Sequence, residues 1–153
     1  MNFYQEPTLK EFNQLNKQID QLYHKIAVKQ NLSDSAFLIL YSILELGDTC
    51  TQKDICDFIF LNKQTVNSSI QKLQKEGYIR LQSGAGREMQ IFLTENGENL
   101  MKDKILPIVE AENKVFQEML PTERSMLINL TEKYFLLFRE QLHKIFKLSS
   151  EDL

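Results

Sequence analysis

The side chains best suited to recognition chemistry lie on one short segment, from Gln64 to Lys75. Val66, Ile70 and Leu73 are four and three residues apart, which at about 100° per residue places them on one stripe of an α-helix. With that stripe buried, the exposed residues are Gln64, Ser68, Gln71 and Lys75 opposite it and Thr65, Asn67 and Lys72 on its flanks. Amide, hydroxyl and amine groups of this kind bond to base edges and phosphates. The segment therefore predicts a helix that contacts nucleic acid.

A shorter helix is predicted just before the polar one. Thr51 and Asp54 have the spacing of a capping box, in which two residues satisfy each other's backbone N–H groups. A turn is expected at residues 61–63, and two helices joined by so tight a turn form a helix-turn-helix. Between cap and turn, apolar residues recur at helical spacing: Ile55, Phe58 and Ile59.

A β-hairpin is predicted directly after the polar helix. Gly77 suits a left-handed cap at the helix end. The β-rich runs 78–81 and 88–93 flank a glycine-containing tip at 83–86, next to Arg87. Two strands joined by such a tip form a hairpin. A polar helix face is commonly only solvated surface, but the order of these pieces favours a DNA-binding winged helix-turn-helix.

Length and composition fit one soluble domain over residues 1–153. The chain has 42% hydrophobic and 25% charged residues, which is ordinary for a globular protein with a core. No apolar run approaches the roughly 20 residues that span a bilayer. The first twelve residues lack the basic start and apolar centre of a signal peptide. A cytoplasmic protein without membrane association is expected.

Catalytic and metal-binding patterns are not evident. Cys50 and Cys56 lack CxxC spacing, and His24 and His143 are isolated in the sequence. Structural thiols are therefore expected, with redox sensing by Cys50 or Cys56 as the alternative. We find no nucleophile–base motif, phosphate loop or paired carboxylates. The sequence predicts neither an enzyme nor a cofactor.

Charge is distributed unevenly along the chain. The net charge is −3, which by itself disfavours nucleic acid as a partner. Residues 51–90, however, hold six basic and four acidic residues, against 12 basic and 17 acidic elsewhere. This local excess of two positive charges is modest, so DNA affinity is expected to need both subunits of a dimer.

Long helices are predicted on both sides of this region. In residues 9–28 an a/d stripe is formed by Phe12, Leu15, Ile19, Leu22 and Ile26, and such a stripe needs a partner helix. Ser33 suits the N-cap of a helix that ends at Gly47. Thr94 suits the cap of another long helix, in which Pro107 predicts a kink or break. A last helix is expected over residues 123–147.

These outer helices carry more apolar surface than a small helix-turn-helix core can cover. Homodimerisation would cover it, and packing within one subunit is the alternative. A two-fold dimer also places two polar helices about 34 Å apart, at successive major-groove faces of double-stranded DNA.

The sequence resembles the MarR family of bacterial transcriptional regulators over nearly its whole length. The segments that carry the resemblance are Leu32–Ser33 with Phe37 and Leu40, Thr51–Ile55, Asn62–Asn67, Leu73–Ile79 and Leu93–Gly97. It implies a mainly α fold with a small β-hairpin wing, in which 32–93 form the winged helix-turn-helix and 1–31 with 94–148 form dimerisation helices. It also implies a homodimer that places its recognition helix in the major groove and loses DNA affinity on binding a small aromatic or lipophilic effector.

Two features depart from the family pattern. Where the wing usually has an Asp and two basic residues, Ala85 and Gly86 take the first two positions and only Arg87 remains. Ser68 stands where many members carry Arg. The cysteine positions do not match the peroxide-sensing branch, and the isolated histidines do not match the zinc-sensing branch.

We therefore expect a sequence-specific regulator, a repressor acting on a pseudo-palindromic operator. The groove-facing candidates are Gln64, Thr65, Asn67, Ser68, Gln71 and Lys72; the phosphate candidates are Lys53, Lys63 and Lys75; the wing candidate is Arg87. Effector-pocket candidates are Phe12, Tyr23, Phe37 and Tyr41, for which core packing is the alternative. The alternative function is a winged-helix module that binds a protein instead of DNA.

Overall fold

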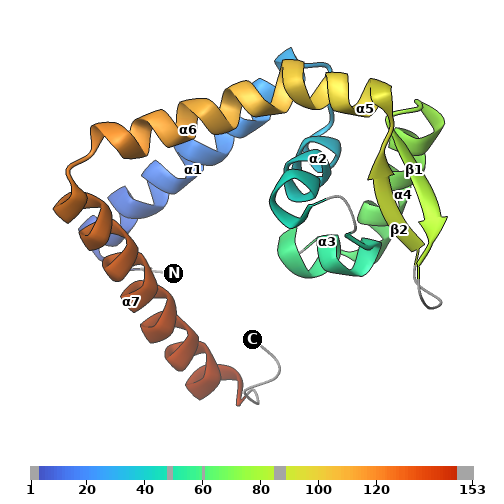
Figure 1. The fold of residues 1–153 in the computed structure, drawn as a ribbon. Helices are drawn as coiled ribbons and strands as arrows, with labels where there is room; N and C mark the ends of the chain where they lie inside the picture. The colour runs from blue at the N-terminus through green and yellow to red at the C-terminus, as the bar shows by residue number, and fades with distance from the viewer. Residues whose placement is uncertain (1–3, 48–49, 60, 85–88, 148–153) are drawn as a thin grey trace. The chain divides into compact units, whose positions relative to one another are not determined.

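The computed structural model describes residues 4–47, 50–59, 61–84 and 89–147. In chain order its elements are α1 (Pro7–Lys29), α2 (Asp34–Leu46), α3 (Gln52–Ile59), α4 (Lys63–Lys75), β1 (Ile79–Ser83), β2 (Met89–Leu93), α5 (Glu95–Leu100), the π-turn η1 (Met101–Ile105), α6 (Leu106–Glu118) and α7 (Pro121–Phe146). The mainly helical fold with a hairpin wing is confirmed (Figure 1). Among the described helices, none has the length and hydropathy of a membrane span.

The chain divides into two compact units, Met1–Pro107 and Ile108–Leu153. In the first unit, α2, α3 and α4 lie side by side next to the hairpin (Figure 1). In the second, α7 exposes large apolar side chains around much of its circumference, among them Leu130, Phe135 and Phe138. A helix that is apolar over so wide an arc needs cover from other helices.

Helix α2 is the centre of the first unit. Its N-cap is Ser33, whose Oγ accepts from the Ala36 N–H at 3.2 Å, and it ends at Gly47 with φ +83°, both as predicted. Its buried residues occupy more than one face of the helix, because α1, α3, α4 and η1 all contact it. They are Ala36, Phe37, Ile39, Leu40, Ser42 and Ile43.

The hairpin is joined to the helices through β2. Strands β1 and β2 are antiparallel, with Arg80 opposite Phe92 and Leu81 opposite Ile91. The Ile91 N–H donates to the Cys50 carbonyl at 2.8 Å, and a further bridge pairs Thr51 with Gln90. The residues just before α3 therefore attach to the wing through an isolated β-bridge and one backbone hydrogen bond.

Both ends of α1 are capped. At its start, a Glu6 Oε2 accepts the Leu9 N–H at 2.7 Å, and hydrogen bonds from Thr8 and Leu9 hold the pKa of the Glu6 carboxyl below its usual range. At its end, Asn31 has φ +58°, and Lys104 of η1 donates to the Gln30 carbonyl at 2.6 Å. A basic side chain there satisfies a terminal carbonyl of the helix.

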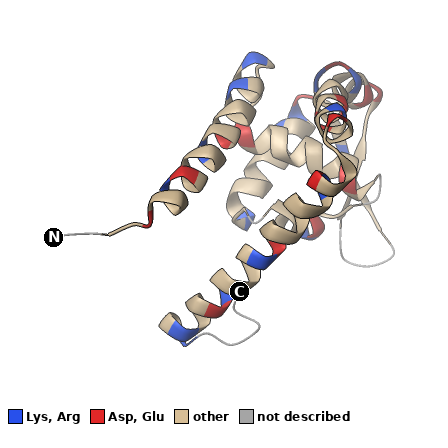
Figure 2. Ribbon diagram, turned by 90° about the vertical axis from the view of Figure 1, so that its left-hand side faces the viewer, with Lys and Arg blue, Asp and Glu red and all other residues tan. Residues whose placement is uncertain are grey.

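The predicted apolar stripe of α1 is largely exposed in the single chain. Leu15, Ile19 and Leu22 are 54%, 51% and 59% exposed, although α1 contacts α2. Charges of both signs are spread along the length of α1 (Figure 2). The stripe therefore provides an apolar surface for another helix.

The helical segments around Pro107 show how the chain accommodates this proline. Immediately before it, η1 replaces α-helical geometry, and the Leu106 N–H donates to the Met101 carbonyl five residues earlier. Proline lacks an N–H and its ring crowds the carbonyl four residues earlier in an α-helix, so a wider turn gives it room. The sequence predicted a kink or break here, and the structure has a π-turn.

The capping box of α3 is confirmed. The Thr51 N–H and Oγ1 both donate to Asp54 Oδ2 at 2.8 Å, and the Asp54 N–H donates to Thr51 Oγ1 at 3.2 Å. These bonds from Thr51 favour the ionised carboxylate and lower the Asp54 pKa from its ordinary value of 3.8.

We expect Thr51→Val to lower the free energy of unfolding at pH 7 by about 1 kcal/mol, because the cap hydroxyl is lost. Thr51→Ser keeps the hydroxyl and is the matched control. Since the folded-state pKa of Asp54 is lowered, its contribution is complete above pH 3.8 and is lost as the pH falls through the folded-state value. The difference between parent and Thr51→Val should therefore shrink under acid. Urea unfolding at several pH values measures this, and equal stability at pH 7 would contradict it.

Candidate nucleic-acid interface

Helix α4 begins at a side-chain cap that the sequence analysis did not identify. Asn62 Oδ1 accepts the Thr65 N–H at 2.8 Å, and the Asn62 carbonyl accepts the Val66 N–H at 3.2 Å. Asparagine is among the preferred N-cap residues, which is the signal that could have found it. The helix therefore starts at Lys63, one residue earlier than predicted.

One narrow face of α4 is buried, as the spacing predicted. Val66, Ile70 and Leu73 are buried against the core, and α4 contacts both α2 and α3. Ser69 is buried with them, and its Oγ lies 2.8 Å from Ser35 Oγ, near the start of α2. This burial fixes the rotation of α4 about its axis and so determines which residues face outward.

The polar candidates on α4 lie on the outward surface. Thr65 is half-buried, and the others are exposed: Gln64, Asn67, Ser68, Gln71, Lys72 and Lys75. Two of these already have intramolecular partners. Ser68 Oγ donates to the Thr65 carbonyl at 2.9 Å, and Lys72 Nζ lies 3.9 Å from Glu76 Oε1. Gln64, Asn67 and Gln71 therefore carry the amide groups best placed for direct base contacts.

The end of α4 is clamped to the segment that follows the wing. Gly77 has φ +78°, its N–H donates to Gln74, and the Tyr78 N–H donates to Leu73, each at 3.0 Å. This is a Schellman motif. Thr94 then donates through Oγ1 to the Gly77 carbonyl at 2.6 Å and through its N–H to the Tyr78 carbonyl at 3.0 Å.

Gly97 allows this clamp to close. The Gly97 N–H donates to Thr94 Oγ1 at 3.1 Å. A Cβ at position 97 would lie 1.9 Å from the Tyr78 carbonyl oxygen, far inside van der Waals contact. The first turn of α5 can therefore approach the end of α4 because residue 97 has no side chain.

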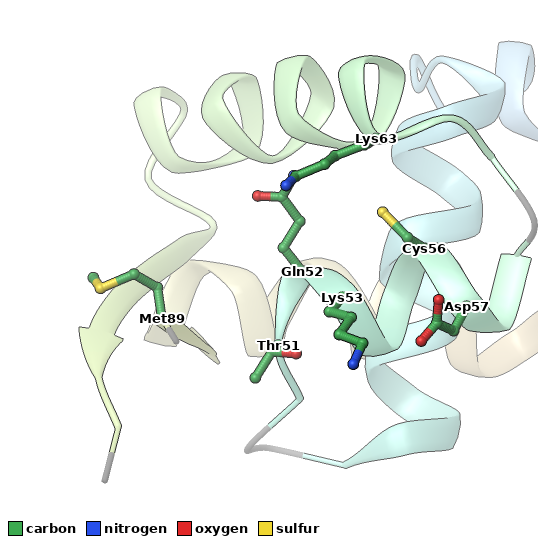
Figure 3. A pocket seen from close by; sticks show the side chains of 7 residues that line it. All are labelled: Thr51, Gln52, Lys53, Cys56, Asp57, Lys63 and Met89. Carbon is green, nitrogen blue, oxygen red and sulfur yellow. The ribbon is translucent and has the colours of Figure 1, made fainter. Parts of the chain in front are cut away.

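The phosphate candidates Lys53 and Lys63 lie around one recess. Its volume is about 500 Å³. Besides the two lysines, Cys56 and Asp57 of α3 and Met89 of β2 line it, together with Thr51 and Gln52 at the start of α3 (Figure 3). Lys75, the third candidate, is exposed at the other end of α4. Gln52 was not among the predicted residues, because its position beside α4 depends on tertiary packing.

The wing candidate Arg87 lies outside the described residues, as do Ala85 and Gly86. Within the described strands, Arg80 is the basic residue of the wing. Its guanidinium lies 4.7 Å from the centroid of the Phe92 ring, and its Nη1 donates to Gln82 Oε1 at 2.7 Å. The sequence analysis missed this arrangement, since it depends on strand pairing.

Three of the four aromatic effector-pocket candidates lie together at the contact of α1 and α2. The ring centroids of Tyr23 and Phe37 are 6.2 Å apart, as are those of Phe37 and Tyr41. Phe37 is buried, whereas Tyr23 and Tyr41 are half-buried. The fourth, Phe12, lies about three turns before Tyr23 on α1 and is exposed. Nearby, His24 Nδ1 lies 2.9 Å from Asp34 Oδ1, a surface link between the two helices.

The two cysteines differ in exposure. Cys50 is buried and Cys56 is partly exposed, and neither forms a disulfide in the described part of the chain. No group of three potential metal ligands from His, Cys, Asp and Glu occurs among the described residues.

Comparison with known proteins agrees with this geometry. Residues 30–88, from the end of α1 through α4 to the wing, match the sequence model of the MarR family. Over these residues the chain is similar to the MarR family. Members of this family are transcriptional regulators. No curated protein sequence matched the chain.

Solved structures, among them several named as MarR family regulators, share the fold. One from Neisseria meningitidis superposes with a TM-score of 0.75 at 24% identity, covering 94% of this chain and 99% of its own. BpsR of Bordetella bronchiseptica, whose DNA binding is regulated by 6-hydroxynicotinic acid, gives 0.63 at 16% identity, covering 88% and 98%. A Staphylococcus aureus MarR in complex with salicylate and kanamycin gives 0.67 at 17% identity, covering 88% and 91%.

We expect Gly97→Ala to lower the free energy of unfolding by about 1–3 kcal/mol, the usual cost of overpacking. The added methyl group would push α5 away from Tyr78 and open the Thr94 clamp. Asn96→Ala, one residue earlier and exposed, is the control and should change stability little. Urea unfolding of the three proteins tests this, and equal stability of the two variants would argue against the close contact.

Proposed function

We propose that this protein is a regulator of the MarR family, a homodimeric repressor that binds a pseudo-palindromic DNA operator and is controlled by a small aromatic or lipophilic effector. The observation that carries the proposal is the presentation of α4. Its buried stripe and two capped ends hold a row of amide and amine side chains outward. A rigid polar helix of this kind fits the major groove.

Positions facing the groove are assigned to Gln64, Thr65, Asn67, Ser68, Gln71 and Lys72, with Gln64 and Asn67 as the main direct base contacts because of their exposed amides. Phosphate contacts are assigned to Lys53, Lys63 and Lys75. The wing contact is assigned to Arg87. One subunit provides few positive charges, so useful affinity requires two copies on one duplex.

The exposed stripe of α1 supports dimerisation. Three of its residues, Leu15, Ile19 and Leu22, are each more than half exposed, and burial of such residues is worth about 1.5–3 kcal/mol each. Helix α7 adds further apolar surface. We assign residues 1–31 and 94–148 to dimerisation and 32–93 to DNA binding.

The aromatic group of Tyr23, Phe37 and Tyr41 is the proposed effector contact. It lies where α1, a dimerisation helix in this proposal, meets α2 of the core. A ligand inserted there would alter the angle between the two helices, and so the distance between the two copies of α4. Two solved relatives bind or respond to small aromatic acids, which supports this ligand class.

The proposal is tested by selecting DNA from a random pool and titrating binding with salt. A preferred sequence with half-sites about 10 bp apart and a steep loss of affinity with salt are expected. Retention of no duplex even at low salt would favour the alternative, a winged-helix module that binds a protein.

On the selected operator, Gln64→Ala and Asn67→Ala should each reduce discrimination at one base position by about 1–3 kcal/mol. Lys72→Ala should instead weaken all sequences similarly, because a lysine contributes mainly charge. Competition binding against single-base operator variants measures both effects. Equal losses on every sequence for all three variants would refute this division of roles.

We expect Ile19→Glu to produce a monomer, since it places a charge in the apolar stripe of α1. Operator affinity should then fall by about 100-fold or more, as the second half-site contact becomes a separate binding event. Lys17→Glu, at an exposed and already charged position, is the control for added negative charge. Light scattering after size exclusion gives the mass, and a dimeric Ile19→Glu protein would show that α1 is not the interface.

A further inference from the structure

Two adjoining hollows lie between α3 and α4, and they share two residues. The first is the recess of about 500 Å³ around Lys53, Lys63 and Cys56. The second, of about 470 Å³, is lined by Gln52, Lys63, Gln64 and Asn67. Gln52 and Lys63 therefore stand at the boundary between the recess and the surface that carries the proposed base contacts.

Gln52 and Lys63 approach each other across the two helices. In Figure 3 the carboxamide of Gln52 extends from the first residue of α3 toward the amine of Lys63 at the first residue of α4. Both helices are held by side-chain caps, Thr51 with Asp54 for α3 and Asn62 for α4. The two side chains therefore start from fixed backbone positions.

The charges around the recess favour an anion. Of its seven lining residues, all within the described chain, Lys53 and Lys63 are basic and Asp57 alone is acidic. The first turn of α4 contains no acidic side chain. A lysine at the first position of a helix lies at the positive end of the helix dipole, which disfavours it unless an anion is near. A bound phosphate would relieve this repulsion.

We infer that the recess seats one phosphate of the DNA backbone in each half-site, and that Gln52 is a positioning residue that directs Lys63 toward it. The inference rests on the proposed DNA-binding function and adds to it a defined phosphate seat and a residue outside the predicted set. A DNA strand whose bases contact Gln64 and Asn67 has its backbone beside the groove edge, where Lys63 and Gln52 lie. Gln52 and Lys63 then determine at which position along α4 the DNA strand binds.

The reactivity of Cys56 can show whether a phosphate occupies the recess. It lines the recess and is partly exposed, whereas Cys50 is 4% exposed. Operator duplex should therefore slow the alkylation of Cys56 by iodoacetamide several-fold, and mass spectrometry of the Cys56 peptide measures the rate. Inorganic phosphate, added at the same concentration of phosphate groups, should not slow the alkylation. Equal protection by inorganic phosphate would overturn the assignment to the DNA backbone.

The role of Gln52 is tested by Gln52→Met, which keeps the length of the side chain and removes its polar atoms. Operator affinity should fall about tenfold and equally on all sequences, because Lys63 would no longer be directed toward the phosphate. Gln74→Met, an exposed glutamine of α4 outside both hollows, is the matched control. Asp57→Asn should raise affinity at low salt, because it removes the acidic charge of the recess.

A scan of the operator with neutral methylphosphonates separates positioning from a general structural effect. For the parent protein, substitution of one particular phosphate in each half-site should cause a large loss of operator affinity. For Gln52→Met, the same substitution should reduce affinity much less. Identical scan profiles for both proteins would overturn the role of Gln52. A parent that binds DNA without protecting Cys56 refutes the phosphate seat alone, whereas a parent that binds no duplex refutes the proposed function and this inference together.

Discussion

The packing of α4 on α2 is the interaction on which the other features depend. Val66, Ile70 and Leu73 are buried against a helix that is itself buried on several sides. Burial of three such side chains is worth several kcal/mol, at about 1.5–3 kcal/mol each. Any rotation of α4 that exposed them would lose this energy. The outward direction of the polar row is therefore fixed by apolar packing on the opposite side of the same helix.

The two ends of α4 are held by different means, and both join the polar face of α4 to neighbouring segments. Asn62 caps the start within the tight turn after α3. Beyond the end, Thr94 and Gly97 bring the first turn of α5 onto the Gly77–Tyr78 backbone. Helix α5 in turn continues into η1.

Because the protein carries no net positive charge, the positions of its basic side chains matter for the proposed DNA binding. The protein has a net charge of −3, so it cannot rely on a broad basic surface for DNA affinity. Two lysines from different helices instead line one recess beside the polar face of α4. In the wing, Arg80 is stacked on Phe92 and bonded to Gln82. Few charges in fixed positions favour recognition by geometry, and they explain why the proposed mechanism uses two subunits.

The sequence by itself determined the order of the elements and several of their ends. Helical spacing identified the buried stripe of α4, and local chemistry identified the caps at Ser33, Thr51 and Thr94 and the left-handed glycines at Gly47 and Gly77, because these depend on neighbours within a few residues. It also identified the disruption before Pro107, although not the π-turn that accommodates it. Only the tertiary structure placed Gln52 beside Lys63 and Arg80 over Phe92. It also brought the Tyr78 carbonyl into the space that a side chain at position 97 would occupy. These contacts join residues on different elements, and their geometry depends on the packing of whole helices and strands rather than on spacing along the chain.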